Sequence, residues 1–95
     1  MSLVIWKTII PTASDREVMI PAGAEILCAH EQGTEICSWY KCNPASPVKP
    51  RRIDVIGTGF HAPDSGRYLG SAFISAFGRP DSLVFHLFEP TGDSK

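Results

Sequence analysis

A short glycine-containing stretch is the first place where this sequence could do chemistry. Gly57, Thr58 and Gly59 follow a β-branched run, and Ala62 comes three residues after Gly59. The spacing G-x-G-x-x-A matches the fingerprint in which glycines turn a strand into a helix whose N-terminus binds a pyrophosphate. Residues 63–66, Pro-Asp-Ser-Gly, are typical of a turn and do not begin an amphipathic helix. We therefore expect the glycines to turn the chain after a strand rather than to bind a dinucleotide.

Side chains that bind anions or stack on bases surround this loop in the sequence. Arginine contacts phosphate in a bidentate manner, and tyrosine or histidine can stack on a base. Glycines let the backbone approach a ligand, and successive N–H groups can form a nest for an anion. The predicted ligand-binding residues are therefore Arg51, Arg52, Thr58, Gly59, His61, Arg67 and Tyr68. The alternative interpretation is that these are solvated loop residues without a function.

Metal binding and catalysis have weaker support in the sequence. Structural zinc sites usually show two close ligand pairs, whereas only Cys37 and Cys42 are close here. His61 and Asp64 share a loop that has no nucleophile signature, and His86 stands within an apolar strand as a packed, hydrogen-bonded histidine would. We expect no metal site, no cofactor and no enzymatic activity.

Length and composition bound the remaining possibilities. The chain has 95 residues, 43% of them hydrophobic, and this is enough for one domain with one core. A net charge of −1 does not suit direct binding to nucleic acid, whose partners usually carry a basic face. No apolar run reaches the roughly 18 residues of a membrane span, and the first residues do not resemble a signal peptide. Three cysteines, an odd number, favour a reducing cytosol.

The elements that must position these residues are predicted to be strands. Eight prolines and eight glycines interrupt the chain so often that little room is left for a helix. The intervening segments are rich in β-branched and aromatic residues. We expect an all-β fold, a small antiparallel β-sandwich or barrel of about seven short strands. The strands are predicted at 3–10, 16–21, 24–31, 34–42, 51–58, 67–74 and 83–89, within a single β domain at 1–89 that is followed by a flexible tail at 90–95.

The clearest local unit is a β-hairpin. A two-residue turn at Gln32 and Gly33 would place Cys28 opposite Cys37, so that the two thiols could oxidise. Residues 43–50, which contain three prolines, are predicted to form a surface loop because proline cannot donate to a ladder.

The last predicted strand is apolar on both faces. Its sequence, LVFHLF at 83–88, suits a central strand or a subunit interface. Self-association would help so small a chain to bury its apolar surface, so we expect a homodimer.

Six segments follow one another in an order that covers nearly the whole chain. They are Ile5-Trp6-Lys7, Pro21-Ala22-Gly23-Ala24-Glu25-Ile26-Leu27, Trp39, Gly57-Thr58-Gly59, Tyr68-Leu69-Gly70-Ser71 and Val84-Phe85-His86-Leu87-Phe88-Glu89. In this order the chain resembles a family of small bacteriophage and prophage proteins with no settled activity. The family usually runs Gly-Thr-Gly-His, whereas Phe60 here separates Gly59 from His61.

The resemblance implies a phage gene product that acts in the cytoplasm of an infected bacterium. Small phage proteins of this kind often counter host defences, so the expected function is a non-enzymatic binding protein that inhibits a host defence protein, in the manner of an anti-CRISPR. One alternative is a sponge that sequesters a small nucleotide signal at the Gly57–Gly59 loop. Another is a minor structural or assembly protein of the virion.

Overall fold

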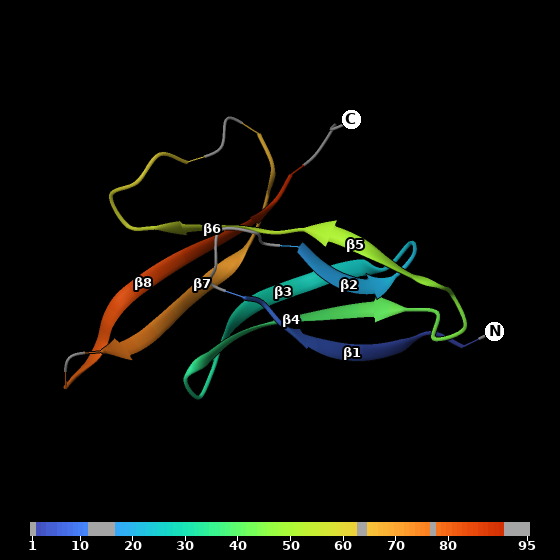
Figure 1. Ribbon diagram of the computed structural model, residues 1–95, viewed down its shortest axis with the longest axis horizontal. Helices are drawn as coiled ribbons and strands as arrows, with labels where there is room; N and C mark the ends of the chain where they lie inside the picture. Colours follow the sequence, from blue (N-terminus) through green and yellow to red (C-terminus); the bar gives the residue numbers. More distant parts are fainter. Residues whose placement is uncertain (1, 12–16, 63–64, 77, 91–95) are drawn as a thin grey trace.

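The regular secondary structure of the described residues consists of antiparallel β-strands. The structure is a computed structural model that describes residues 2–11, 17–62, 65–76 and 78–90. No helix occurs in these ranges, and no helix there could span a membrane. The strands are β1 (Val4–Ile9), β2 (Glu17–Pro21), β3 (Glu25–Gln32), β4 (Glu35–Cys42), β5 (Val48–Arg52), β6 (Asp54–Gly57), β7 (Arg67–Ala76) and β8 (Arg79–Glu89) (Figure 1). The expected all-β fold is confirmed.

Three small sheets share one hydrophobic core. Their strand orders are β1-β4-β3, β2-β5 and β6-β8-β7. Figure 1 shows the β2-β5 pair lying over the β1-β4-β3 sheet, with the long β7-β8 hairpin crossing beside them. All three sheets contribute to the buried cluster of Ile10, Val18, Ile20, Ala24, Ile26, Ala29, Ile36, Tyr40, Cys42, Ile53, Val55, Leu69, Ala72 and Leu87. The sheets therefore form one packed unit, while residues 91–95 of the expected tail lie outside the described ranges.

The β3-β4 hairpin is present, but its predicted turn is wrong by one residue. Gln32 pairs with Glu35, so the turn consists of Gly33 and Thr34. Gly33 has a φ of +65°, a left-handed conformation that glycine adopts without the strain it would impose on glutamine. Cys37 consequently faces His30 rather than Cys28, and both cysteines are free thiols.

The proline-rich segment is the second correction. Residues 48–50, expected in a loop, begin β5, and Pro50 lies opposite Met19 of β2. Among the described residues β5 pairs with β2 alone, and proline is tolerated in a strand that has an unpaired edge.

The strand expected at 51–58 divides in two at Ile53. The chain pairs with β2 before this residue and with β8 after it, which transfers it from one sheet to another. The Ile53 side chain is fully buried, so the transfer is fixed within the core.

The last strand is central, one of its two expected positions. β8 lies between β6 and β7, with Leu87 buried and Val84, His86 and Phe88 half-buried. This explains why its sequence is apolar on both faces.

Strands β3 and β7 meet where two sheets approach one another. Gly70 of β7 has a φ of +147°, and a Cβ at this position would overlap the carbonyl oxygen of Ala29. Nearby, the Phe73 N–H donates to Glu31 Oε1 at 3.0 Å. This hydrogen bond lowers the pKa of Glu31, since it stabilises the ionised carboxylate. The glycine allows the approach, and the carboxylate covers an edge N–H of β7.

Candidate functional site

The glycine loop is a β-turn that ends β6. Phe60 N–H donates to Gly57 O at 3.1 Å, and Gly59 has a φ of +96°, as the third residue of a type II turn requires. Thr58 N–H donates to Val84 O at 3.2 Å. The glycines thus turn the chain after a strand, and two of the loop's N–H groups point at backbone carbonyls rather than at a ligand.

Phe60 is the prominent residue of this turn, and the sequence analysis did not select it. Its side chain is 78% exposed, yet it packs over Gly57, where an added Cβ would be only 3.1 Å from Phe60 Cδ2. The signal in the sequence that could have indicated it is the position of Phe60 between Gly59 and His61, where the family that the sequence resembles usually has Gly-His directly. The absence of a side chain at Gly57 therefore lets the exposed Phe60 ring pack against the backbone.

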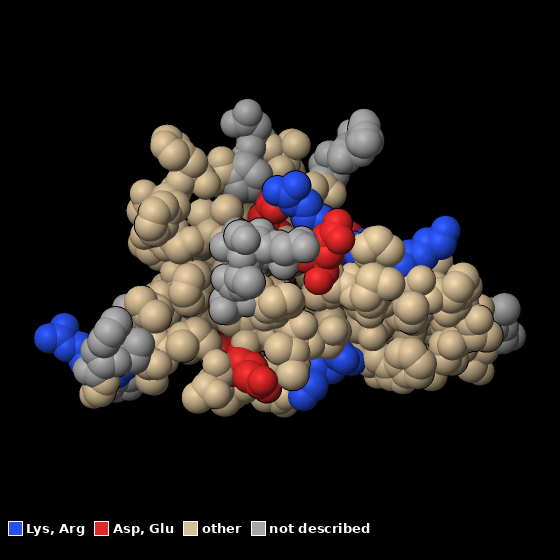
Figure 2. Space-filling model, in the orientation of Figure 1, with Lys and Arg blue, Asp and Glu red and all other residues tan. Residues whose placement is uncertain are grey.

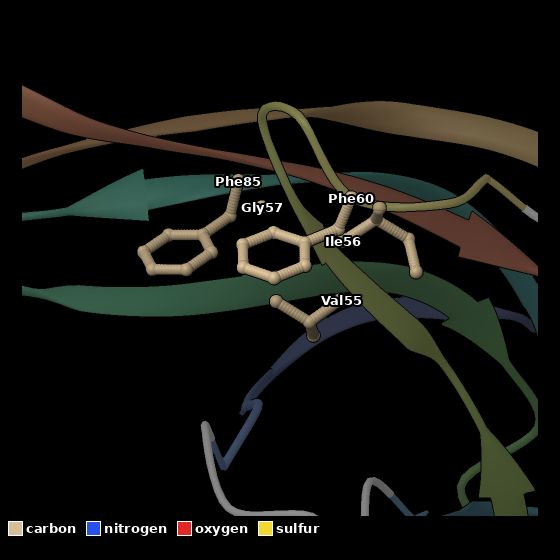
Figure 3. A pocket seen from close by; sticks show the side chains of 5 residues that line it. All are labelled: Val55, Ile56, Gly57, Phe60 and Phe85. Atoms are coloured by element: carbon tan, nitrogen blue, oxygen red, sulfur yellow. The ribbon is translucent and has the colours of Figure 1, made fainter.

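Two hollows on the surface are lined in part by Phe60. One, of about 330 Å³, is lined by Val55, Ile56, Gly57, Phe60 and Phe85. Figure 3 shows the Phe60 and Phe85 rings next to one another above Val55. The other, of about 180 Å³, is lined by Gly57, Thr58, Phe60, Leu83, Val84 and Phe85. We call Phe60 and these two hollows the Phe60 patch, an apolar surface at one end of the β6-β8-β7 sheet.

Two of the predicted arginines converge on one carboxylate. Arg51 binds Glu89 Oε2, and Arg67 Nη2 lies 3.3 Å from Glu89 Oε1. Each arginine also donates to a backbone carbonyl of the β3 region: Arg51 to Ala24 O at 2.9 Å, and Arg67 to Ile26 O. We call these three charged residues the Glu89 cluster. Its arginines use their donors to hold the last strand to the edge of β3.

Arg52 is paired as well, although it is more accessible. Its Nε donates to Asp54 Oδ1 at 2.9 Å, and this hydrogen bond raises the pKa of the Arg52 guanidinium. The Arg52 side chain is 70% exposed. A cavity of about 410 Å³ beside it is lined by Pro50, Arg51, Arg52, Glu89 and Pro90.

Thr58 and Tyr68 meet through two residues that the sequence analysis did not select as ligands. Tyr68 OH lies 2.6 Å from Ser71 Oγ, which lies 2.9 Å from His86 Nδ1. On the other side of the ring, His86 Nε2 lies 2.9 Å from Thr58 Oγ1. We call this row the hydroxyl–imidazole chain. It links β7, β8 and the turn after β6 across one sheet.

One arrangement of protons satisfies every contact of the chain. Thr58 Oγ1 donates to Val84 O at 3.2 Å, so its oxygen accepts the proton of His86 Nε2. His86 Nδ1 then accepts from Ser71, and Ser71 accepts from Tyr68. The Ser71–His86 distance is one that nucleophile–base pairs also show, but the far ring nitrogen faces a hydroxyl rather than the carboxylate that stabilises an imidazolium. The geometry serves to fix three strands.

The structure therefore divides the predicted site into separate groups. Arg51 and Arg67 bind Glu89, and Arg52 binds Asp54. Thr58 and Tyr68 belong to the hydroxyl–imidazole chain. Gly59 and His61 lie on the exposed loop. Figure 2 shows acidic and basic side chains lying next to one another near the middle of the molecule, with uncharged residues over most of that face. Within the described ranges, no group of acidic, histidine or cysteine residues could hold a metal ion.

Comparison with known protein families gives a match over the whole chain. A family model described as "Domain of unknown function (DUF7352)" matches residues 1–95. The chain belongs to this family. No curated protein and no solved structure matches it. The description of the DUF7352 family assigns no activity.

Proposed function

We propose that this protein is a non-enzymatic, phage-encoded binding protein that counters a bacterial defence system by inhibiting a host protein in the host cytoplasm. The observation that supports this proposal is the Phe60 patch. An aromatic side chain 78% exposed, held in place by a turn hydrogen bond and lining two apolar hollows, has the character of an interface anchor. Because the turn hydrogen bond fixes the backbone that carries the ring, less conformational entropy is lost on association than for a residue on an unstructured loop.

The pairing of the arginines favours a protein target over a phosphorylated ligand. Arg51 and Arg67 bind Glu89, and Arg52 binds Asp54. A phosphate would have to displace these carboxylates to reach the guanidinium groups, and the two carboxylates repel an anion at short range. The N–H groups of Thr58 and Phe60 are also engaged.

A second candidate is the sequestration of a small nucleotide signal. The observation that favours it is the cavity of about 410 Å³ beside Arg51 and Arg52. Arg52, which is mostly exposed, could turn from Asp54 toward a phosphate in this cavity.

The test is phage infection of bacterial strains that each carry one defined defence system. Wild-type protein is expected to restore plaque formation in at least one strain. Phe60→Ala should weaken that effect at least tenfold, which corresponds to a loss of about 1.4 kcal/mol in binding. The matched control is Met19→Ala, which removes another exposed apolar side chain, 57% exposed on β2, and should leave the effect intact.

Native mass spectrometry of the purified protein separates the alternatives. A retained nucleotide mass that Arg52→Ala abolishes, together with a fully active Phe60→Ala variant, would replace the proposal with the second candidate. Incorporation of the protein into purified virions without any effect on defence would replace it with a structural role. Wild-type protein that fails in every defence-carrying strain would refute it.

A further inference from the structure

We propose that the outer edge of β1 pairs with β1 of a second copy of this chain, so that two three-stranded sheets join into one of six. The strand order would be β3-β4-β1 in one protomer, continued by β1-β4-β3 in its partner. This inference rests on the edge of the first sheet and does not depend on the function of the Phe60 patch.

The backbone of β1 presents unpaired groups at its outer edge. Among the described residues β1 pairs with β4 alone, and Figure 1 shows it as the outermost strand of its sheet. Ile10 N–H donates to Ile36 O at 2.8 Å, in the register of the β1-β4 ladder. Because successive residues of a strand point their N–H and C=O groups to opposite sides, Ile5, Lys7 and Ile9 direct theirs away from β4.

The side chains of β1 suit a covered strand better than an exposed edge. Ile5 is 62%, Ile9 50% and Trp6 44% exposed, so both faces of the strand carry accessible apolar groups. Exposed edges are usually protected by charged residues, and Lys7 is the only charged residue of β1. Its ammonium donates to Gln32 Oε1 on β3, which directs the side chain inward across the sheet.

The other outer strands among the described residues differ from β1. At the outer edge of β3 the carbonyls of Ala24 and Ile26 accept from Arg51 and Arg67, and Phe73 N–H of β7 donates to Glu31. The strand β6 has only 4 residues, and β2 and β5 have 5 each and both contain a proline. Edges covered by side chains or kept short do not recruit a further strand, so β1 is the edge best suited to pairing.

Symmetry and charge select the register of the pair. A two-fold axis perpendicular to the sheet keeps each face of the sheet on the same side, so paired residues must both be even or both be odd. Centring the pair on Trp6 or on Lys7 gives the largest overlap of Val4–Ile9 with its copy. A centre at Lys7 makes the two lysines direct cross-strand partners, and two residues of like charge at such positions destabilise a sheet. The pair is therefore centred on Trp6, with Ile5 opposite Lys7 of the partner.

A Trp6-centred pair also makes good use of the tryptophan. The odd-numbered residues form the new hydrogen bonds, so the two Trp6 residues face each other at a non-hydrogen-bonded position, where Cα atoms are about 4.5 Å apart. Cross-strand aromatic pairs at such positions stabilise sheets. Tyr40, the β4 partner of Trp6, extends the aromatic row in each protomer.

Sedimentation analysis of the full chain tests whether the dimer forms. Wild-type protein should have twice the 10.4 kDa chain mass, and Ile5→Lys should raise the dimer dissociation constant at least a hundredfold. The matched control Met19→Lys also puts a lysine at an exposed apolar position, and it should remain dimeric. Far-UV circular dichroism verifies that each variant is folded. A monomeric wild type, or a dimer that folded Ile5→Lys leaves intact, would overturn the proposal.

Disulfide trapping tests the register separately. Trp6→Cys places two thiols across the axis at a separation that a disulfide can bridge, whereas Ile5→Cys faces Lys7 of the partner. Mild oxidation should cross-link Trp6→Cys at least tenfold faster than Ile5→Cys, with wild type reporting the background from Cys28, Cys37 and Cys42. Equal rates, or faster cross-linking of Ile5→Cys, would refute the Trp6-centred register.

Discussion

Glu89 shows how the same residue types can serve a ligand or the fold. Its two carboxylate oxygens receive Arg51 and Arg67, residues whose chemistry also predicts phosphate binding. The arginines are 38 and 22 residues away from Glu89 in the sequence, so no local pattern reveals the partner. The sequence supplied the right cations for a bidentate contact, and tertiary structure supplied the anion.

Removing the charge of Glu89 should destabilise the fold more than removing the charge of a carboxylate at the surface. Glu89 is 16% exposed at its side chain, and Glu89→Gln should cost about 2 kcal/mol because two arginines lose a charged acceptor. In the control, Glu25→Gln removes a partner of Lys41 at 3.4 Å in a pair 61% and 45% exposed, and should cost less than about 0.5 kcal/mol. Urea unfolding at neutral pH measures both, and equal losses would contradict a structural role for the Glu89 cluster.

Phe60 shows what a residue-by-residue search overlooks. The spacing of Gly57 and Gly59 predicts a turn after a strand, and the turn is present. An exposed phenylalanine has no comparable chemical signature in the sequence. The features that distinguish Phe60 are tertiary: the two hollows that it lines and the position of its ring against Gly57.

At the scale of elements, the alternation of side chains between the two faces of a strand is easier to predict than the pairing register of two strands. Moving the β3-β4 turn by one residue changes each pairing partner but leaves side chains on the same faces, because the register moves by two. His30 and Trp39 accordingly share a face, and their rings stack at 4.5 Å. Ile26 lies on the other face from Cys28 and His30, because the register shifts between Ile26 and Cys28 at an irregularity without a clear composition signal.

The division between β5 and β6 depends on partners far along the chain. Nothing in residues 51–58 shows that the first part pairs with β2 and the second with β8. Proline counting likewise excluded residues 48–50 from a strand, although a strand with a single neighbour accepts proline.

The crossing of β3 and β7 yields a prediction at this scale. Gly70→Ala should destabilise the protein by about 3 kcal/mol, because a Cβ would overlap the Ala29 carbonyl and the backbone is left-handed. Gly23→Ala is the matched control: Gly23 has a φ of +78° with no atom near its Cβ position, so only backbone strain of about 1 kcal/mol applies. Thermal unfolding of both variants distinguishes the steric cost from the conformational one, and equal losses would show that the crossing is loose.

For the molecule as a whole, composition predicted the all-β fold class. It could not predict how the strands are divided among three sheets. Frequent glycine and proline with β-branched and aromatic segments specify short antiparallel strands. Three sheets around one core follow from contacts such as those of Ile20, Ile26 and Leu87, which belong to different sheets and to one buried cluster.

This shared core should make unfolding a single transition. Trp6 and Trp39 report on the first sheet, whereas far-UV circular dichroism reports on all strands. The urea unfolding curves measured by the two probes should coincide, because unfolding of one sheet removes part of the core that the other two sheets share. A fluorescence transition separated from the circular dichroism transition would show that the β6-β8-β7 sheet is an independent unit.

The sequence separation within the Glu89 cluster has a consequence for synthesis. The β3-β4 hairpin leaves the ribosome before Arg51 and Arg67 do, so the carbonyls of Ala24 and Ile26 have no side-chain donor until these two arginines have been synthesised. In that interval the edge of β3 is open to the solvent and to other nascent chains. The edge of β3 is therefore covered only after Arg67 of β7 has been synthesised, and Glu89 of β8 then binds both arginines that cover it.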